Sequence, residues 1–211
     1  RYLDDLPIDN PWESTAPIRV RHLLDHTSGL GDAHLWQVFS ARTSPDLPLR
    51  DGIARPGTRI RLHSPPGQRF SYSNTGFLLL GLLIEARTGE RYEPWLDREL
   101  LTPLGMTRSS FAWVSQVGRR ADTTMAMGHF ENGTRQSSYA IPVRPASQFA
   151  TTASDMARFA RFLMGDGRVN GTTLVDSALL AAMGRPTTTD ARRAGIVTGY
   201  ALGLQSRERW G

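Results

Sequence analysis

Tyr72 and Asn74 stand two residues apart, directly before the most apolar segment of the chain. A phenol has a pKa of about 10, so it becomes a base only where a cation or a helix dipole lowers that pKa. A side-chain amide carries both a donor and an acceptor, and it could grip a substrate amide or orient a lysine. The pair could therefore supply a general base and a substrate contact, or it could form a turn with a helix cap.

The sequence around this pair predicts a turn followed by a buried helix. Residues 65–67, Pro-Pro-Gly, favour a turn, because neither residue type continues regular structure. Residues 77–84 are almost entirely apolar, which predicts a helix capped at its start by Asn74 or Thr75 and at its end by Gly89. The positive end of this helix dipole would then face the phenol and the amide.

His22 and His26 are one helical turn apart, with Asp25 beside the second histidine. On a helix they would share a face, and the spacing is similar to that of an inverted zinc-hydrolase motif. That motif has a glutamate where Asp25 stands, and no third ligand is evident in the sequence. We therefore predict no metal and favour a structural role for the histidines at the carbonyl end of a short helix.

A serine triad of Ser28, His26 and Asp32 is the other candidate for catalysis within this segment. Ser28 lacks the Gly-x-Ser-x-Gly turn that exposes a nucleophile. A histidine and a serine two positions apart on one turn also have poor geometry for proton transfer. We favour a turn in which hydroxyl groups bind the backbone.

The composition excludes several classes of function. The 211 residues include no cysteine, which excludes thiolate chemistry and disulfides. All 25 basic residues are arginine, so any mechanism that needs a lysine must take it from outside this sequence. The net charge is only +5, and the arginines are scattered among acidic residues without forming a basic stripe, which argues against nucleic-acid binding. No apolar run is long enough for a membrane span.

The remaining sequence predicts a mostly helical chain with minor strands. Residues 31–66, rich in proline and glycine, are predicted to form a long excursion over the surface. Asn132-Gly133 predicts a hairpin between residues 126–130 and 135–141. Residues 152–155 predict a capping box before a helix with Met156, Phe159, Ala160 and Leu163 on one face. Further helices are expected at residues 18–26, 92–100 and, after an Asp176 cap, 177–183, and a strand is expected at residues 200–205.

Five segments, in the same order, resemble motifs of the serine β-lactamase-related family, which contains class C β-lactamases, D-alanyl-D-alanine carboxypeptidases and related esterases. Residues 18–30, IRVRHLLDHTSGL, are similar to its HLLxHTSGL segment, and residues 66–74, PGQRFSYSN, are similar to the segment with its Tyr-x-Asn motif. Residues 103–107, 151–159 and 200–204 resemble its PLGM turn, its STAxDMARF helix start and the strand before its last motif. Together these segments extend across nearly the whole chain.

The resemblance implies an α+β fold of the β-lactamase/DD-peptidase type, in which a helical region lies beside an antiparallel sheet. This chain would supply mainly the helical region, with minor antiparallel strands. We expect residues 1–211 to be part of one such domain, truncated at both ends. Ser147 and Gln148 stand where the family commonly has two glycines, which makes the shape of that loop an open question.

The resemblance also implies a serine hydrolase that works through an acyl-enzyme and three motifs. Ser-x-x-Lys would supply the nucleophile and a lysine, Tyr-x-Asn the base and a substrate contact, and Lys-Thr-Gly or His-x-Gly the edge of the sheet. Only the second motif maps here, with Tyr72 as the candidate general base and Asn74 as the candidate substrate contact. The segment alone is therefore expected to be inactive, and His26 and Ser28 are expected to be structural.

The implied substrate is a small molecule or a peptide: an ester, a β-lactam or a D-Ala-D-Ala peptide, turned over without a metal or cofactor. The sequence does not separate lactamase, carboxypeptidase and esterase, and it leaves the oligomeric state open. A catalytically inactive relative that binds peptidoglycan peptides or a protein partner is the alternative. An extracytoplasmic location, periplasmic or secreted, is favoured by the resemblance only.

Overall fold

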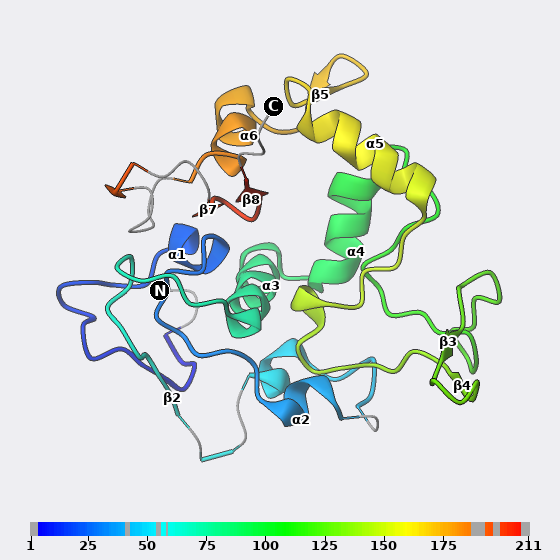
Figure 1. Cartoon of the computed structure of the whole chain (residues 1–211), viewed down its shortest axis with the longest axis horizontal. Helices are drawn as coiled ribbons and strands as arrows, with labels where there is room; N and C mark the ends of the chain where they lie inside the picture. Colours follow the sequence, from blue (N-terminus) through cyan, green and yellow to red (C-terminus); the bar gives the residue numbers. More distant parts are fainter. Residues whose placement is uncertain are drawn as a thin grey trace.

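The computed structural model of the chain describes residues 4–40, 43–53, 56–57, 59–186, 193–195 and 199–207. The fold is α+β and mostly helical, as predicted, and its longest helix, α3, lies at the centre (Figure 1). The helices are α1 (Val20–Leu24), α2 (Leu35–Val38), α3 (Asn74–Thr88), α4 (Tyr92–Leu96), α5 (Ala153–Leu163) and α6 (Ser177–Met183). Shorter turns are the 3₁₀ turns η1 (Leu49–Gly52) and η3 (Arg144–Ala146) and the π-helical turn η2 (Asp97–Leu101).

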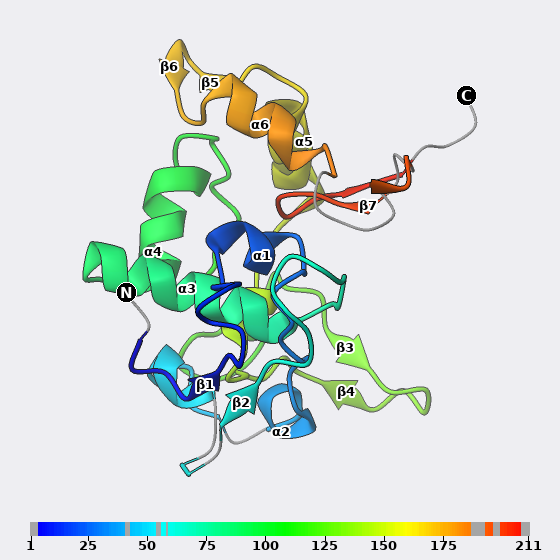
Figure 2. The same ribbon diagram turned by 90° about the vertical axis from the view of Figure 1, so that its left-hand side faces the viewer.

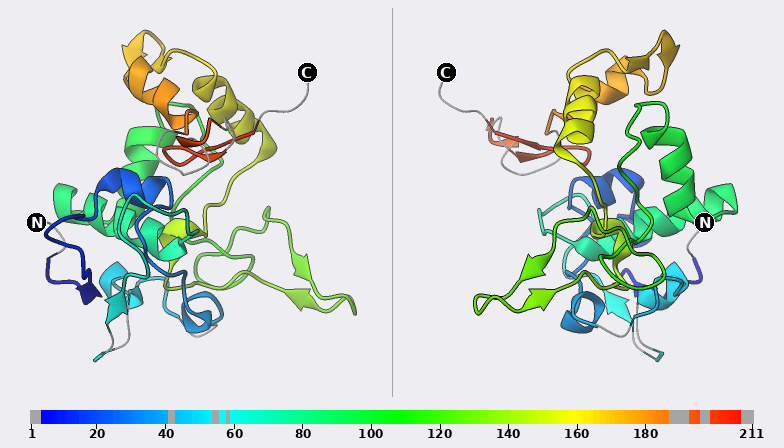
Figure 3. Two further views of the ribbon diagram at one scale, coloured as in Figure 1. Left: turned by 60° about the vertical axis from the view of Figure 1, so that its left-hand side comes forward. Right: turned by 90° about the vertical axis from the view of Figure 1, so that its right-hand side faces the viewer.

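The described residues form four pairs of short strands. Three pairs are antiparallel: β3 (Gly128–His129) with β4 (Arg135–Gln136), which is the predicted hairpin, β5 (Arg168–Val169) with β6 (Thr172–Thr173), which was not predicted, and β7 (Gly199–Tyr200) with β8 (Gln205–Ser206). The fourth pair, β1 (Ile8–Asp9) with β2 (Ile60–Arg61), is parallel and was not predicted. Figure 3 shows the β3–β4 hairpin, in light green, extending from the body of the protein, and Gly133 turns the chain at its tip with φ +81°.

Helix α3 is the buried helix that was predicted to follow the turn at residues 65–67. Its N-cap is Ser73, whose hydroxyl accepts a hydrogen bond from the Gly76 N–H at 3.1 Å. The prediction of Asn74 or Thr75 as the cap was wrong, because both already lie in the first helical turn. The predicted end is confirmed: Gly89 has φ +75°, a conformation that glycine adopts without strain.

The first hydrophobic core surrounds α3. Its buried members on this helix are Leu78, Leu79 and Leu82, and α1 contributes Leu23. Helix α3 also passes close to η3 at Gly81, where a Cβ would lie 2.6 Å from the Cγ of Pro145. Glycine therefore permits the contact that seats η3 against the helix.

The segment of residues 31–66 contributes part of its apolar side chains to this core. Its buried apolar side chains are Leu49, Ile53 and Leu62. The predicted excursion over the surface is correct for most described residues of this segment, which are exposed or half-buried, and wrong for these three. Proline and glycine interrupt regular structure without keeping the neighbouring apolar side chains out of the core.

A second hydrophobic core lies among η2, α5 and α6. Helices α5 and α6 are at the top of Figure 2. The buried residues of this core are Leu101, Leu104, Met106, Phe162 and Leu180. The predicted buried face of α5 is partly wrong, since Met156 is 40% exposed while Phe162 is buried. The predicted helix at residues 92–100 is confirmed as α4 continued by η2.

Helix α5 begins at its predicted cap, because the Thr152 hydroxyl accepts from the Asp155 N–H at 3.3 Å. The Asp155 carboxylate does not form the predicted capping box but binds the loop after η2. It accepts from the Arg108 N–H at 2.9 Å and from the Ser109 hydroxyl at 2.8 Å. This acidic side chain thus ties α5 to the loop after η2 instead of closing its own helix end.

Helix α1 ends at Leu24, two residues before the predicted end, because His26 has φ +58° and cannot continue a right-handed helix. The predicted strand at residues 200–205 is instead a hairpin. Gly203 turns the chain with φ +85°, and the Ala201 N–H donates to the Leu204 carbonyl at 2.8 Å. Helix α6 and its Asp176 cap are as predicted. In the described part of the chain, no helix combines the length and apolar character needed to cross a membrane.

Candidate active site

Two segments, residues 26–32 and residues 63–74, lie side by side and build the candidate site. The N–H groups of His63, Gly67 and Ser71 donate to the carbonyls of Gly29, Thr27 and His26 at 2.8, 2.7 and 2.8 Å. Gly29 permits this approach, since a Cβ at this position would lie 2.1 Å from the Ser64 carbonyl oxygen. The segment that resembles HTSGL therefore fixes the path of the segment that carries Tyr72 and Asn74.

His26 holds the backbone that leads into α3. Its Nδ1 accepts a hydrogen bond from the Ser73 N–H at 3.1 Å, and its ring centre lies 4.5 Å from that of Tyr72. Burial lowers the pKa of His26, although the Asp25 and Asp32 carboxylates partly oppose this effect. Because a protonated Nδ1 cannot accept a hydrogen bond, this contact requires the neutral imidazole.

Ser73 points into the protein, so its two neighbours point outward. Its hydroxyl donates to the Gly31 carbonyl at 2.8 Å while it caps α3. Ser73 has an extended backbone, in which successive side chains face opposite directions. Tyr72 is accordingly 48% exposed and available to a substrate.

Tyr72 and Asn74 are in contact with each other. The Tyr72 hydroxyl donates to Asn74 Oδ1 at 3.2 Å. On the other side, Asn74 Nδ2 donates to Asp32 Oδ1 at 2.9 Å. Sequence reasoning missed this contact and placed Asp32 only in a triad with Ser28 and His26. Asp32 and Asn74 are 42 positions apart, and no local pattern could have linked them.

The phenol of Tyr72 is not prepared to act as a base by this segment alone. Burial raises its pKa above the usual 10.0, and the Tyr200 phenol and the Asp32 carboxylate raise it further. Among the groups of the described residues that shift this pKa, none is a cation. Tyr72 is thus protonated near neutral pH, and it needs a positive charge nearby before it can accept a proton.

Aromatic rings form a wall beside Tyr72. Phe70 stacks on Tyr200 with ring centres 5.1 Å apart, and Tyr200 meets the His26 ring edge-on at 4.8 Å. Tyr200 comes from the β7–β8 hairpin, which lies beside α1 and is held there by a bond from the Gly203 N–H to the Leu24 carbonyl at 3.2 Å (Figures 1 and 2). Phe70 is 47% exposed, so the wall offers an apolar surface next to the polar pair.

The serine triad considered from the sequence is not assembled. Ser28 is buried, and its hydroxyl accepts from the Leu30 N–H at 3.3 Å. His26 directs Nδ1 to the Ser73 N–H, and Asp32 binds Asn74. These contacts give Ser28 and His26 structural roles.

The two histidines of the zinc alternative have separate partners. His22 Nδ1 accepts from the Arg19 N–H at 3.2 Å, and its Nε2 lies 3.3 Å from Arg21 Nε. Within the residues that the structure describes, no three or more His, Asp or Glu side chains are grouped so that they could hold a metal ion.

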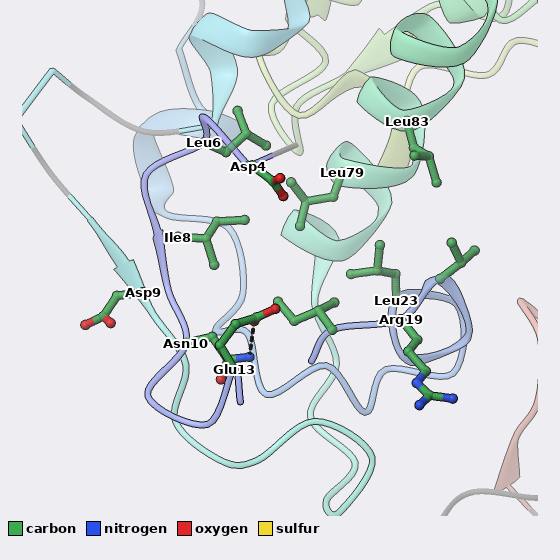
Figure 4. A pocket seen from close by; sticks show the side chains of 12 residues that line it. Asp4, Leu6, Ile8, Asp9, Asn10, Glu13, Arg19, Leu23, Leu79 and Leu83 are labelled. Atoms are coloured by element: carbon green, nitrogen blue, oxygen red, sulfur yellow. Dashed lines mark hydrogen bonds between the residues drawn. The ribbon is translucent and has the colours of Figure 1, made fainter. Parts of the chain in front are cut away.

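A separate cavity of about 750 Å³ lies between the N-terminal segment, α1 and α3 (Figure 4). Its lining includes the apolar residues Leu6, Ile8, Leu23, Leu79 and Leu83 and the charged residues Asp4, Asp9, Glu13 and Arg19. Among the described residues, its lining includes no serine or tyrosine, and neither Tyr72 nor Asn74 belongs to it. This cavity is therefore distinct from the candidate active site.

Almost the whole chain matches one known family. The model of that family, described as Beta-lactamase, covers residues 2–211. The chain belongs to the β-lactamase family. Penicillin-binding protein 4 of Amycolatopsis lactamdurans is 31% identical over 181 residues, which cover 82% of this chain and 45% of that protein. The chain spans about half the length, or less, of the curated relatives it matches.

Solved structures of β-lactamase-family type share the fold. The penicillin-binding protein from Bacillus halodurans superimposes with a TM-score of 0.66 at 21% identity, covering 92% of this chain and 57% of that one. The D-stereospecific amidohydrolase from Streptomyces sp. gives a TM-score of 0.64 at 23% identity, covering 89% of this chain and 56% of that one. The predicted β-lactamase/DD-peptidase-like fold is thereby confirmed.

The loop at Ser147 and Gln148 keeps a glycine-like shape within this β-lactamase-family chain. Gln148 has φ +68°, in the left-handed region that favours glycine. Its Nε2 donates to the Tyr139 carbonyl at 3.2 Å, but its Oε1 is buried without a partner among the described residues. The backbone at Gln148 thus has a conformation that suits glycine, and the glutamine side chain is incompletely satisfied.

Proposed function

We propose that the protein is a serine hydrolase that acts through an acyl-enzyme on an ester, a β-lactam or a D-Ala-D-Ala peptide. Membership of the β-lactamase family supports the class of reaction. The relative named penicillin-binding protein 4 supports a substrate of the β-lactam kind. The substrate is accordingly a small molecule or a peptide.

The contact between Tyr72 and Asn74 is the observation that carries this proposal. The hydroxyl of the half-exposed Tyr72 lies 3.2 Å from Asn74 Oδ1. His26 and Ser73 hold the intervening backbone from behind. Proton transfer and substrate orientation both need polar groups on a rigid support. Tyr72 is the proposed general base, and Asn74 is the proposed substrate contact.

The serine and lysine of this mechanism come from residues outside these 211, because Ser-x-x-Lys cannot occur in a sequence without lysine. The ammonium group of that lysine lowers the pKa of Tyr72 and opposes the burial and the negative charge that raise it. Tyr72 then accepts the proton of the serine hydroxyl while the serine oxygen bonds to the substrate carbonyl carbon.

The tetrahedral intermediate collapses by breaking the bond between the carbonyl carbon and the leaving group, which takes the proton from Tyr72. A water molecule next loses a proton to the same base and attacks the acyl-serine ester. Breaking the carbon–serine bond releases the acid and returns the proton to the serine. Asn74 holds the substrate through its amide during both steps.

Labelling of the full-length protein with a fluorescent penicillin, together with hydrolysis of a nitrophenyl ester and a chromogenic cephalosporin, tests the proposal. The wild type should react, and Tyr72→Phe should lose about 100-fold or more in acylation rate, because general-base catalysis contributes about 10²- to 10⁴-fold. Tyr139→Phe removes a phenol outside the site and should keep the wild-type rate. The 211 residues alone should remain unlabelled.

Two outcomes contradict the proposal. A folded full-length protein that neither labels nor hydrolyses any of the three substrates would instead be an inactive relative, and binding of a peptidoglycan peptide would then identify it as a receptor. Reaction of the 211 residues alone would place the nucleophile within this segment.

A further inference from the structure

Asp32 lies where the two segments of the site meet, and it binds the first residue of α3 twice. Its Oδ1 accepts from the Asn74 backbone N–H at 2.7 Å and from Asn74 Nδ2 at 2.9 Å. The same oxygen accepts from the Ala33 N–H at 2.7 Å. The first N–H groups of a helix have no partner within the helix, and the dipole favours an anion there. Asp32 thus anchors both the backbone and the side chain of Asn74.

The contact with Asp32 decides which end of the Asn74 amide faces Tyr72. An ionised carboxylate accepts hydrogen bonds and cannot donate them, so the NH₂ end of the amide must face Asp32. A flipped amide would place its oxygen against the carboxylate, and two acceptors would face each other without a proton between them. The oxygen end is therefore left for Tyr72, whose hydroxyl donates to it at 3.2 Å.

We propose that Asp32 is a positioning residue for the reaction: it fixes the orientation of the Asn74 amide, the proposed substrate contact, beside Tyr72. The inference rests on the proposed function, in which these two residues act on the substrate. Asp32 itself touches neither the serine nor the substrate in this scheme and acts through Asn74.

The geometry also separates the effect of position from the effect of charge. All three hydrogen bonds fall on one oxygen of Asp32. Asparagine at this position can place its carbonyl oxygen at the same point and accept the same bonds without a negative charge. Asp32→Asn therefore keeps the positioning contact, and Asp32→Ala removes it.

Acylation rates of full-length variants test the inference. Asp32→Ala should react at least about tenfold more slowly, approaching the roughly 100-fold cost of a 1 Å misplacement in an active site. Asp32→Asn should stay within about threefold of the wild type, because the acceptor is retained. The double variant Asp32→Ala/Asn74→Ala should lose less than the sum of the two single losses, since part of the effect of Asp32 passes through the Asn74 amide.

Asp176→Ala is the matched control for loss of a helix-capping carboxylate. Asp176 accepts from the Ala178 and Leu179 N–H groups at the start of α6 at 2.9 and 3.3 Å. Asp176→Ala should lower the melting temperature about as much as Asp32→Ala does, because each variant removes a carboxylate bound to N–H groups at a helix start. It should leave the acylation rate unchanged. A reduced acylation rate in Asp32→Ala, together with a wild-type rate in Asp176→Ala, would show that Asp32 acts by positioning and not through stability.

A second measurement covers the case in which Asp32→Ala fails to fold. The side-chain amide signals of Asn74, assigned in ¹H–¹⁵N spectra by their loss in Asn74→Ala, should differ in position between the wild type and Asp32→Asn, because the acceptor changes from a carboxylate to an amide oxygen. The same signals should keep their wild-type position in Asp176→Ala. Signals at the same position in the wild type and in Asp32→Asn would overturn the inference.

The kinetic outcomes distinguish the two proposals. A wild-type protein that does not react overturns both of them. A reactive wild type with an equally reactive Asp32→Ala, or with additive losses in the double variant, overturns only the role of Asp32. Equal losses in Asp32→Ala and Asp32→Asn would mean that charge acts rather than position, which also overturns it.

Discussion

Gly29 lies where the two backbone segments of the candidate site come closest, and its replacement tests how that site is held together. Gly29 has φ +79°, and a Cβ there would lie 2.1 Å from the Ser64 carbonyl oxygen and 3.1 Å from its carbon. The neighbouring atom is backbone and cannot swing away as a side chain would. Gly29→Ala therefore forces residues 26–32 and 63–74 apart.

The expected decrease in the free energy of unfolding of Gly29→Ala is the sum of three effects. An alanine in the left-handed region costs roughly 1–2 kcal/mol. Backbone displacement by an added group in a packed interior costs roughly 1–3 kcal/mol. Weakening the bond from the His63 N–H to the Gly29 carbonyl, now 2.8 Å long, costs roughly 1 kcal/mol more. The total of about 3–6 kcal/mol corresponds to a melting temperature lower by about 6–24 °C for a chain of this size.

Thermal unfolding followed by circular dichroism measures this loss, with Gly133→Ala as the control. Gly133 has φ +81° but nothing within 4 Å of its would-be Cβ, so alanine there meets only the conformational cost. The control should lose about 1–2 kcal/mol. Equal losses in the two variants would refute the close approach of the segments as the reason for glycine at position 29.

Three further changes test other parts of the structure. Glu93→Gln should lower the free energy of unfolding, measured in urea, by about 3–5 kcal/mol. Arg144 and Glu93 are only 2% and 3% exposed, so the buried guanidinium would lose its anion. A loss below about 1 kcal/mol, typical of a surface ion pair, would contradict this prediction. Ser73→Ala should lower the unfolding free energy by about 1 kcal/mol through loss of the α3 cap, and an unchanged melting temperature would show that the cap is dispensable. Burial holds the folded pKa of His26 below 6.5, so the unfolded chain takes up the extra proton and stability should fall as the pH drops below about 6.5. Melting temperatures between about pH 7.5 and 5 should show this fall, and a His26→Asn variant with the same pH dependence would exclude His26 as its source.

The sequence by itself determined the local features of this protein. The polar pair before an apolar helix, the Gly89 end of α3, the Asp176 cap of α6 and the Asn132-Gly133 hairpin are all present as predicted. Each depends on residues a few positions apart, whose backbone preferences and hydrogen bonds act within one turn. The ordered motifs also indicated the family before any fold was known, because family membership is recorded in the sequence itself.

Only the tertiary structure decided how the local features meet. Leu49, Ile53 and Leu62 are buried, although their segment is predicted to be a surface loop. They pack against α3 because burial of apolar side chains against each other removes them from water. The tertiary structure also brought Asp32 to Asn74 across 42 positions and placed Tyr200 beside Tyr72. Burial and a nearby carboxylate then set the pKa of Tyr72, and both depend on distances through space. Sequence spacing identifies a tyrosine that could be a base, and the fold determines which groups around it favour or oppose that role.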